Sequence, residues 1–122
     1  MPARVASQRQ KSARAVYLRG AGRRLQVRLL QRPAVATLMA GMWELPVYEP
    51  TEADELAFTV RHAITVTNHV VDVYTPKVRA GSVREDETWV GVADLHRYAL
   101  TGLTRKVLRR IGCLRDPESV AP

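Results

Sequence analysis

The chain has 122 residues, of which 46% are hydrophobic and 6% are aromatic. This length and composition suit one hydrophobic core and exclude two domains that each bury a core of their own. Nineteen Lys and Arg against twelve Asp and Glu give a formal net charge of +7, and no acidic residue precedes Glu44. The charge favours a polyanionic partner, although basic ends that only keep the protein in solution are an equally good interpretation.

The sequence also excludes several classes of protein. No apolar run approaches the roughly 18 residues of a membrane span, and residues 1–10 lack the apolar core of a secretory signal. The single Cys113 cannot form an internal disulfide bond, and it cannot build a zinc or iron–sulfur site by itself. The three His residues are scattered along the chain, so we expect no metal ion and no catalytic residue set.

A hairpin is predicted near the N-terminus. The run ARAVYLR at 13–19 is rich in β-branched and aromatic residues and ends at a Gly-Ala-Gly turn. The following run, 23–32, alternates apolar and polar residues, which is typical of a strand with one buried face. Pro33 ends that strand because proline cannot donate to a sheet ladder. Residues 1–12 are expected to be a basic, flexible arm.

The middle of the chain predicts a turn, a short helix and further strands. In LMAGMWELP, at 38–46, Gly41 is expected to turn tightly and Trp43 to pack beside the sheet. Thr51 can cap a helix of at most two turns, because acidic residues follow it. Residues 62–78 are dominated by Val, Ile, Thr and Tyr, which predicts two strands or one bent strand.

Helical signals gather near the C-terminus. A polar turn at 80–88 leads into a short strand, TWVGV, after which Asp94 can cap a short helix. Thr101 can cap a longer helix, which places apolar side chains on one face and ends at Gly112. Its other face carries Arg105, Lys106, Arg109 and Arg110. Residues 113–122 are expected to be a flexible tail.

Three pieces of the sequence carry a resemblance to a known family. They are LLQRP with LMAGMWELP at 29–46, a strand that begins RHAIT at 61, and the closing YALTGLTRKVL at 98–108. In this order they resemble the C-terminal domain of the MutY family of A/G-specific adenine DNA glycosylases. The resemblance implies an α/β fold like that of Nudix hydrolases, a mixed β-sheet sandwiched between helices, over residues 13–112.

The resemblance also implies a function. The family domain recognises 8-oxoguanine opposite adenine in duplex DNA and hydrolyses no nucleotide. The base-excising chemistry resides in a separate N-terminal helical domain with a catalytic acid and a four-cysteine iron–sulfur cluster, which do not fit in this chain. We therefore expect a DNA-repair module that is not catalytic alone and carries no cofactor in this chain. It would work with a glycosylase catalytic domain in cis, in the bacterial cytoplasm or nucleoid.

Candidate recognition residues follow from the family's lesion-reading loop, which carries an aromatic residue, a Ser or Thr, and a His. An ungapped alignment puts Ile64, Thr65 and Val66 in these three places. A one-step slip would instead bring Asn68 and His69 to the tip, with donors and acceptors suited to a purine edge. We expect base contacts from Ile64, Thr65, Asn68 and His69. Ordinary strand residues on a half-exposed face are an equally good interpretation of the same positions.

Two alternatives come from other classes of protein. A nucleotide pyrophosphohydrolase of the Nudix type needs a helix with several carboxylates that converge on magnesium. Glu52 and Glu55 lie three residues apart, but the rest of that pattern is missing, so the metal-binding box would be degenerate. A basic, non-catalytic interaction module is the third hypothesis. If the partner is DNA, we expect Arg105, Lys106 and Arg109 to contact its backbone.

Overall fold

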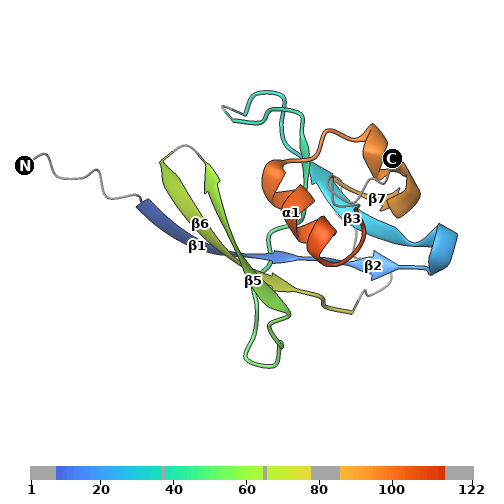
Figure 1. The fold of residues 1–122 in the computed structure, drawn as a ribbon, viewed down its shortest axis with the longest axis horizontal. Helices are drawn as coiled ribbons and strands as arrows, with labels where there is room; N and C mark the ends of the chain where they lie inside the picture. Colours follow the sequence, from blue (N-terminus) through green and yellow to red (C-terminus); the bar gives the residue numbers. More distant parts are fainter. Residues whose placement is uncertain (1–7, 37, 65, 78–85, 115–122) are drawn as a thin grey trace, which may run out of the picture.

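The structure is a computed structural model that describes residues 8–36, 38–64, 66–77 and 86–114. In this part of the chain a mixed set of strands is packed against one α-helix (Figure 1). The strands are β1 (Gln8–Ala15), β2 (Leu18–Arg19), β3 (Gln26–Gln31), β4 (Trp43–Glu44), β5 (Phe58–Ile64), β6 (Thr67–Tyr74) and β7 (Glu87–Gly91). The helical segments are the 3-10 helices η1 (Gly22–Arg24) and η2 (Val92–Arg97) and the α-helix α1 (Gly102–Arg110).

The strands form two sheets. In the first, β6 lies between β1 and β5, parallel to β1 and antiparallel to β5. In the second, β3 pairs antiparallel with β2, β4 and β7. The two sheets are joined where the end of β1 meets the segment after β4, since the Ala15 N–H donates to the Pro46 carbonyl and the Tyr48 N–H donates to the Ala13 carbonyl. The mixed α/β fold expected from the sequence is confirmed.

The predicted N-terminal hairpin is only partly correct. Leu18–Arg19 does pair with β3, but Gln8–Ala15 pairs with β6 instead. The expectation of an unpaired arm over residues 1–12 was therefore wrong from Gln8 onward. The polar, basic composition of this strand hid it, because Arg9, Gln10 and Lys11 are exposed and need no apolar side chain.

The helix predicted after Thr51 is a single turn. The Asp54 N–H donates to the Thr51 carbonyl, while the Asp54 carboxylate accepts from the Thr51 N–H at 2.7 Å. The second of these is one of the two bonds of a capping box, but no helix follows. The Ala57 N–H already donates to Val73, and β5 begins at Phe58, so the chain has no room for a second turn.

The core lies between the sheets and α1. Val27, Leu29 and Val90 come from the second sheet, while Val60, Val71 and Val73 come from the first. These side chains pack with Leu45, Leu95 and Leu100 and with Val107 and Leu108 of α1. Trp43 is partly buried against this core and meets Tyr98 edge to face, with ring centroids 5.3 Å apart. The predicted place of Trp43 is confirmed.

The predicted C-terminal helix is also confirmed. Thr101 is its N-cap, and its hydroxyl accepts a hydrogen bond from the Thr104 N–H. Gly112 follows the helix with a φ of +85°, in the region that favours glycine. Cys113 lies beyond the helix but packs against the core, and burial raises the pKa of its thiol. Cys113 is therefore not part of a flexible tail, and residues 115–122, the rest of the predicted tail, lie outside the described part.

The outer face of the second sheet is closed by side chains of its own. Arg28 is only 3% exposed, and its guanidinium lies between the rings of Tyr17 and Trp89, 4.5 and 4.8 Å from their centroids. Its Nη1 is 3.5 Å from a Glu87 oxygen. This arginine is therefore structural, and its charge is not offered to a ligand. Within the described residues no helix is long and apolar enough to cross a membrane.

Candidate nucleic-acid interface

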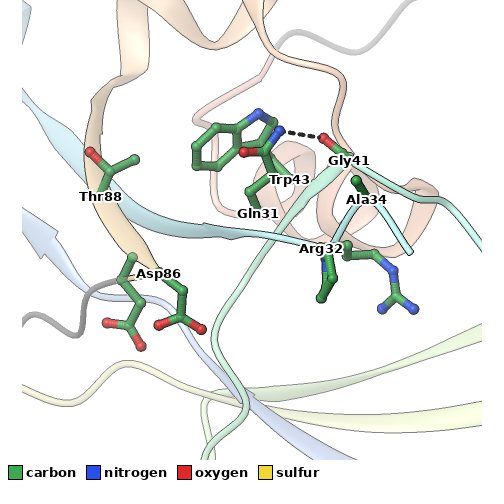
Figure 2. A pocket seen from close by; sticks show the side chains of 9 residues that line it. Gln31, Arg32, Ala34, Gly41, Trp43, Asp86 and Thr88 are labelled. Carbon is green, nitrogen blue, oxygen red and sulfur yellow. Dashed lines mark hydrogen bonds between the residues drawn. The ribbon is translucent and has the colours of Figure 1, made fainter. Parts of the chain in front are cut away.

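The turn in LMAGMWELP is held by Arg32 and Gln31, and Figure 2 shows the bond that Gln31 makes to Gly41. The Arg32 N–H donates to the Met42 carbonyl, and the Gly41 N–H donates to the Arg32 carbonyl. The Arg32 side chain reaches into the turn, where Nε donates to the Leu38 carbonyl at 3.0 Å. Gln31 Nε2 donates to the Gly41 carbonyl at 2.9 Å. Gly41 has a φ of +73°, so the predicted use of glycine at this turn is confirmed.

Glu44, in β4, lies between two arginines. Arg32 Nη1 is 3.2 Å from one carboxylate oxygen, and Arg14 Nη1 is 3.5 Å from the other. The same Arg14 nitrogen donates to the Leu45 carbonyl at 2.7 Å. Burial lowers the pKa of Arg14, the carboxylate of Glu44 opposes this change, and the charge of Arg32 adds to it. Two cations therefore share one anion, which leaves a local excess of positive charge.

A cavity of about 180 Å³ adjoins this ion cluster. The side chains that line it divide by chemistry into an apolar set and a charged or polar set. The apolar set is Leu38, Met39, Ile64 and Leu103, and the polar set includes Arg14, Arg32, Glu44 and His69. A flat heterocycle with acceptor oxygens on its edge matches this division, because its faces need apolar contacts and its carbonyl oxygens need donors.

The hairpin of β5 and β6 divides the predicted recognition residues between two faces. His62 pairs with His69 and Ile64 pairs with Thr67, and directly opposed residues of an antiparallel pair share one face. Ile64 and His69 line the 180 Å³ cavity. Asn68 points to the opposite face of the strand and lines a second cavity of about 360 Å³, which His69 lines as well. The predicted set is therefore brought together only in part.

The tip of this hairpin contains the remaining candidate. Thr65 lies outside the described residues, so its predicted base contact stays a prediction. Val66 is 63% exposed at the tip, which leaves the position of the family's histidine on the surface with an apolar side chain. The cavity with Asn68 is also lined by Arg9 and Arg61, and this side of the hairpin is therefore basic.

The residues predicted to contact the DNA backbone lie on the exposed side of α1. A cavity of about 550 Å³ is lined by His62, Gly102, Arg105, Lys106, Arg109 and Arg110. We call it the basic groove. Lys106 Nζ donates to the Arg61 carbonyl at 2.7 Å, and the Arg110 guanidinium lies 4.5 Å from the Phe58 ring centroid. These two contacts tie the long side chains of α1 to β5, so the groove is held between a helix and a strand.

His62, in β5, lines both this groove and the 360 Å³ cavity. A Cβ at Gly102 would be 3.2 Å from both Cε1 and Nε2 of His62, so the ring packs against the first residue of α1. Burial lowers the pKa of His62, and the charges of Lys106 and His69 lower it further. The imidazole therefore stays neutral to a lower pH than an exposed histidine does.

The acidic segment after Pro50 does not fit the magnesium site of a hydrolase. A Nudix hydrolase needs several carboxylates on one helix, whereas here the segment is a turn. Asp54 already accepts from the N–H and hydroxyl of Thr51 and from the Tyr48 hydroxyl at 3.0 Å. Among the described residues no group of three or more His, Cys, Asp and Glu is placed to hold a metal ion. No magnesium-dependent hydrolysis is therefore assigned to this segment.

Several residues of the site were missed by sequence reasoning. Arg9 lies in the part of β1 that the sequence did not reveal, and Arg14 lies in a predicted strand whose pairing with β6 the sequence did not reveal. Arg32 belongs to LLQRP and Glu44 to WELP, and both motifs carry the family resemblance. Their shared ion pair would have been the one available signal, since oppositely charged residues flank the same turn.

Comparisons with known proteins establish the fold. No protein-family model matches the sequence, and no curated protein matches it significantly. Among solved structures, the C-terminal domain of mouse MUTYH, in a complex with human PCNA, is 23% identical with a TM-score of 0.64, and the match covers 83% of this chain and 86% of that chain.

Nudix proteins match as well. A MutT Nudix hydrolase from Burkholderia pseudomallei is 23% identical with a TM-score of 0.66, covering 85% of this chain and 98% of that chain. The Nudix domain of Shewanella oneidensis NrtR, solved with ADP ribose, is 17% identical with a TM-score of 0.67, covering 91% of this chain and 90% of that chain. The chain therefore has the Nudix fold, and its expected likeness to the C-terminal domain of MutY-type glycosylases is confirmed at the level of the fold.

Proposed function

We propose that this Nudix-fold domain recognises a damaged purine in duplex DNA, namely 8-oxoguanine opposite adenine, and serves a glycosylase catalytic domain in cis. The observation that carries the proposal is the 180 Å³ cavity between the Arg14–Glu44–Arg32 cluster and the β5–β6 hairpin. The cavity contains both apolar side chains that can contact a ring and donors that can bind the carbonyl oxygens on its edge. The structural likeness to the MUTYH domain supports the same assignment.

The chemistry of the lesion fits the cavity. An 8-oxoguanine base has carbonyl oxygens on two sides and therefore needs donors on both. Arg14 and Arg32, which line the cavity, can donate to such oxygens, and His69 can donate or accept. Ile64 replaces the aromatic residue of the family loop and supplies an apolar surface for the ring. Reading the base in this way requires no metal ion and no cofactor in this domain.

The basic groove supplies the second half of the proposed interface. Arg105, Lys106 and Arg109 line it and would contact phosphates, which position a protein on DNA, whereas contacts to base edges determine what it reads. The groove and the 180 Å³ cavity lie on either side of the first turn of α1, since Thr101 and Leu103 line the cavity and Gly102 lines the groove. One duplex could therefore engage both.

A competition experiment tests the proposal. A labelled duplex with 8-oxoguanine opposite adenine is bound to the parent, and unlabelled duplexes with and without the lesion compete for it. His69→Ala should reduce the preference for the lesion by about 1 kcal/mol, the worth of one hydrogen bond, with little change in affinity for undamaged DNA. Thr65→Ala, measured in parallel, tests the predicted hydroxyl contact.

Lys77→Gln serves as the matched control, because Lys77 is exposed and lines none of the cavities described above. It should leave the preference unchanged. If the parent shows no preference for the lesion, the proposed function is wrong. If the parent shows a preference that both His69→Ala and Thr65→Ala leave intact, the hairpin is not the reader.

A further inference from the structure

We propose that the basic groove is a phosphate site in which His62 takes up a proton when the phosphate binds, so that DNA binding tightens as the pH falls. This regulation rests on the proposed function only in taking DNA as the source of the phosphate. The chemistry recognised is the phosphate group itself, and a free phosphate ion would satisfy the same contacts.

The geometry isolates His62 among cations. Its imidazole packs on Gly102, the first residue of α1, where any side chain would crowd it at 3.2 Å. The first turn of a helix carries unpaired N–H groups and a partial positive charge. From α1 the charged groups that line the groove are Arg105, Lys106, Arg109 and Arg110.

The other elements around the ring add no negative charge. From β6, His69 lies opposite His62. The 360 Å³ cavity, which His62 also lines, adds Arg9 from β1 and Arg61 from β5. No carboxylate is among the described residues that line the groove or that cavity. The free protein therefore offers an imidazolium no partner, and this agrees with the lowered pKa of His62.

A bound phosphate reverses the balance. Its negative charge would lie among Lys106, Arg105 and the His62 ring, and an adjacent anion favours the charged form of histidine. The pKa of His62 must therefore rise on binding, and by linkage the affinity must rise as the pH falls toward the pKa of the free protein. Lys106 is already fixed by its bond to the Arg61 carbonyl, so it is positioned before the ligand arrives.

The pH dependence is measured on an undamaged duplex, so that lesion recognition does not enter. Fluorescence anisotropy at constant ionic strength between about pH 7.5 and pH 5.5 covers the range in which an imidazole takes up its proton. We expect the affinity of the parent to rise by up to about tenfold for each unit by which binding raises the pKa. His62→Gln should remove most of this rise, and His96→Gln, which alters an exposed histidine on η2, should retain it.

NMR titration of the His62 ring in the parent provides a test that needs no variant. Its pKa should rise when duplex DNA is added, and a similar rise with inorganic phosphate alone would show that the site takes a free ion as well as a backbone. If the pKa is unchanged with both, or if His62→Gln keeps the full pH dependence, the proposal is wrong. Equal binding of damaged and undamaged duplexes, with the pH effect intact, would overturn lesion recognition and leave this site standing.

Discussion

The N–H of Leu45 donates a 3.2 Å hydrogen bond to the hydroxyl of Thr104. This bond links the segment after β4 to the first turn of α1, and both residues are buried, at 1% exposure each. The Thr104 hydroxyl also lies 2.8 Å from that of Thr101, the N-cap. The turn that borders the candidate cavity and the helix that carries the basic groove are thus joined through one side chain.

Replacement of that hydroxyl should be costly. Thr104→Val keeps the shape of the side chain but leaves the buried Leu45 N–H without its acceptor, so the free energy of unfolding should fall by about 1–3 kcal/mol. Urea denaturation measures the change. Thr59→Val is the matched control, because the Thr59 hydroxyl bonds to Asp72 at an exposed position, and its effect should be smaller. Equal effects would contradict the assigned role of Thr104.

Removal of the Trp43 ring should destabilise the fold. Trp43→Ala deletes a partly buried ring that packs on the core and meets Tyr98 edge to face, so we expect a loss of about 3 kcal/mol. Trp43→Phe keeps part of the contact and should cost less. Thermal melts compare the two, and an unchanged melting temperature for Trp43→Ala would mean that the ring contributes to binding rather than to folding.

Two glycines with positive φ should differ in their tolerance of a side chain. A Cβ at Gly20 would lie 2.4 Å from the Arg24 carbonyl oxygen, whereas a Cβ at Gly41 would meet only Gln31 Nε2, at 4.0 Å. Gly41→Ala should therefore cost about 1–2 kcal/mol from the backbone alone, and Gly20→Ala should cost more because strain and collision add. Denaturant titration of both variants tests the order, and a Gly20→Ala variant as stable as Gly41→Ala would contradict it.

Stability should depend on pH through His62. Its folded-state pKa lies below the usual 6.5, chiefly because of burial, so the unfolded chain binds more protons between the two values. The contribution of the neutral His62 to the free energy of unfolding is complete above about pH 6.5, and it is lost as the pH falls from there to the folded-state pKa. As the pH falls through this range, the melting temperature of the parent should approach that of His62→Gln. The interpretation fails if both fall in parallel.

The Glu44 carboxylate should matter to both of its arginines. Glu44→Gln leaves Arg14 and Arg32 without their shared anion, and we expect a loss of about 2 kcal/mol, typical of a hydrogen bond to a charged group. A double-mutant cycle with Arg32→Gln isolates the interaction of this pair. A coupling energy near zero would show that Arg32 is held by its contact with the Leu38 carbonyl alone.

Local signals in the sequence predicted local structure well. Gly41 and Thr101 were assigned correctly because a tight turn and an N-cap depend on residues a few positions away. Thr51 gave the same kind of signal, but the helix was wrong because β5 starts within one turn of it. A capping pattern shows where a helix can begin and does not show whether the chain has room to continue.

Features that depend on distant segments could not be predicted. The pairing of β1 with β6 joins residues far apart in the chain, and nothing near Gln8 indicates its partner. The same holds for the candidate site, since Arg14 lies beside Glu44 where β1 pairs with the segment after β4, about thirty residues further along the chain. Which residues of the hairpin share a face follows from the register of β5 and β6, and the sequence does not show that register.

The parallel pairing of β1 with β6 also sets the order in which the protein can assemble on the ribosome. A chain is synthesised from its N-terminus, so β1 emerges first, while the strand that completes its sheet is made only after β2 to β5. The β2–β3 pairing can form early. A nascent chain halted before Thr67 would therefore present β1 as a basic strand without its β6 partner, open to chaperones or to polyanions in its surroundings.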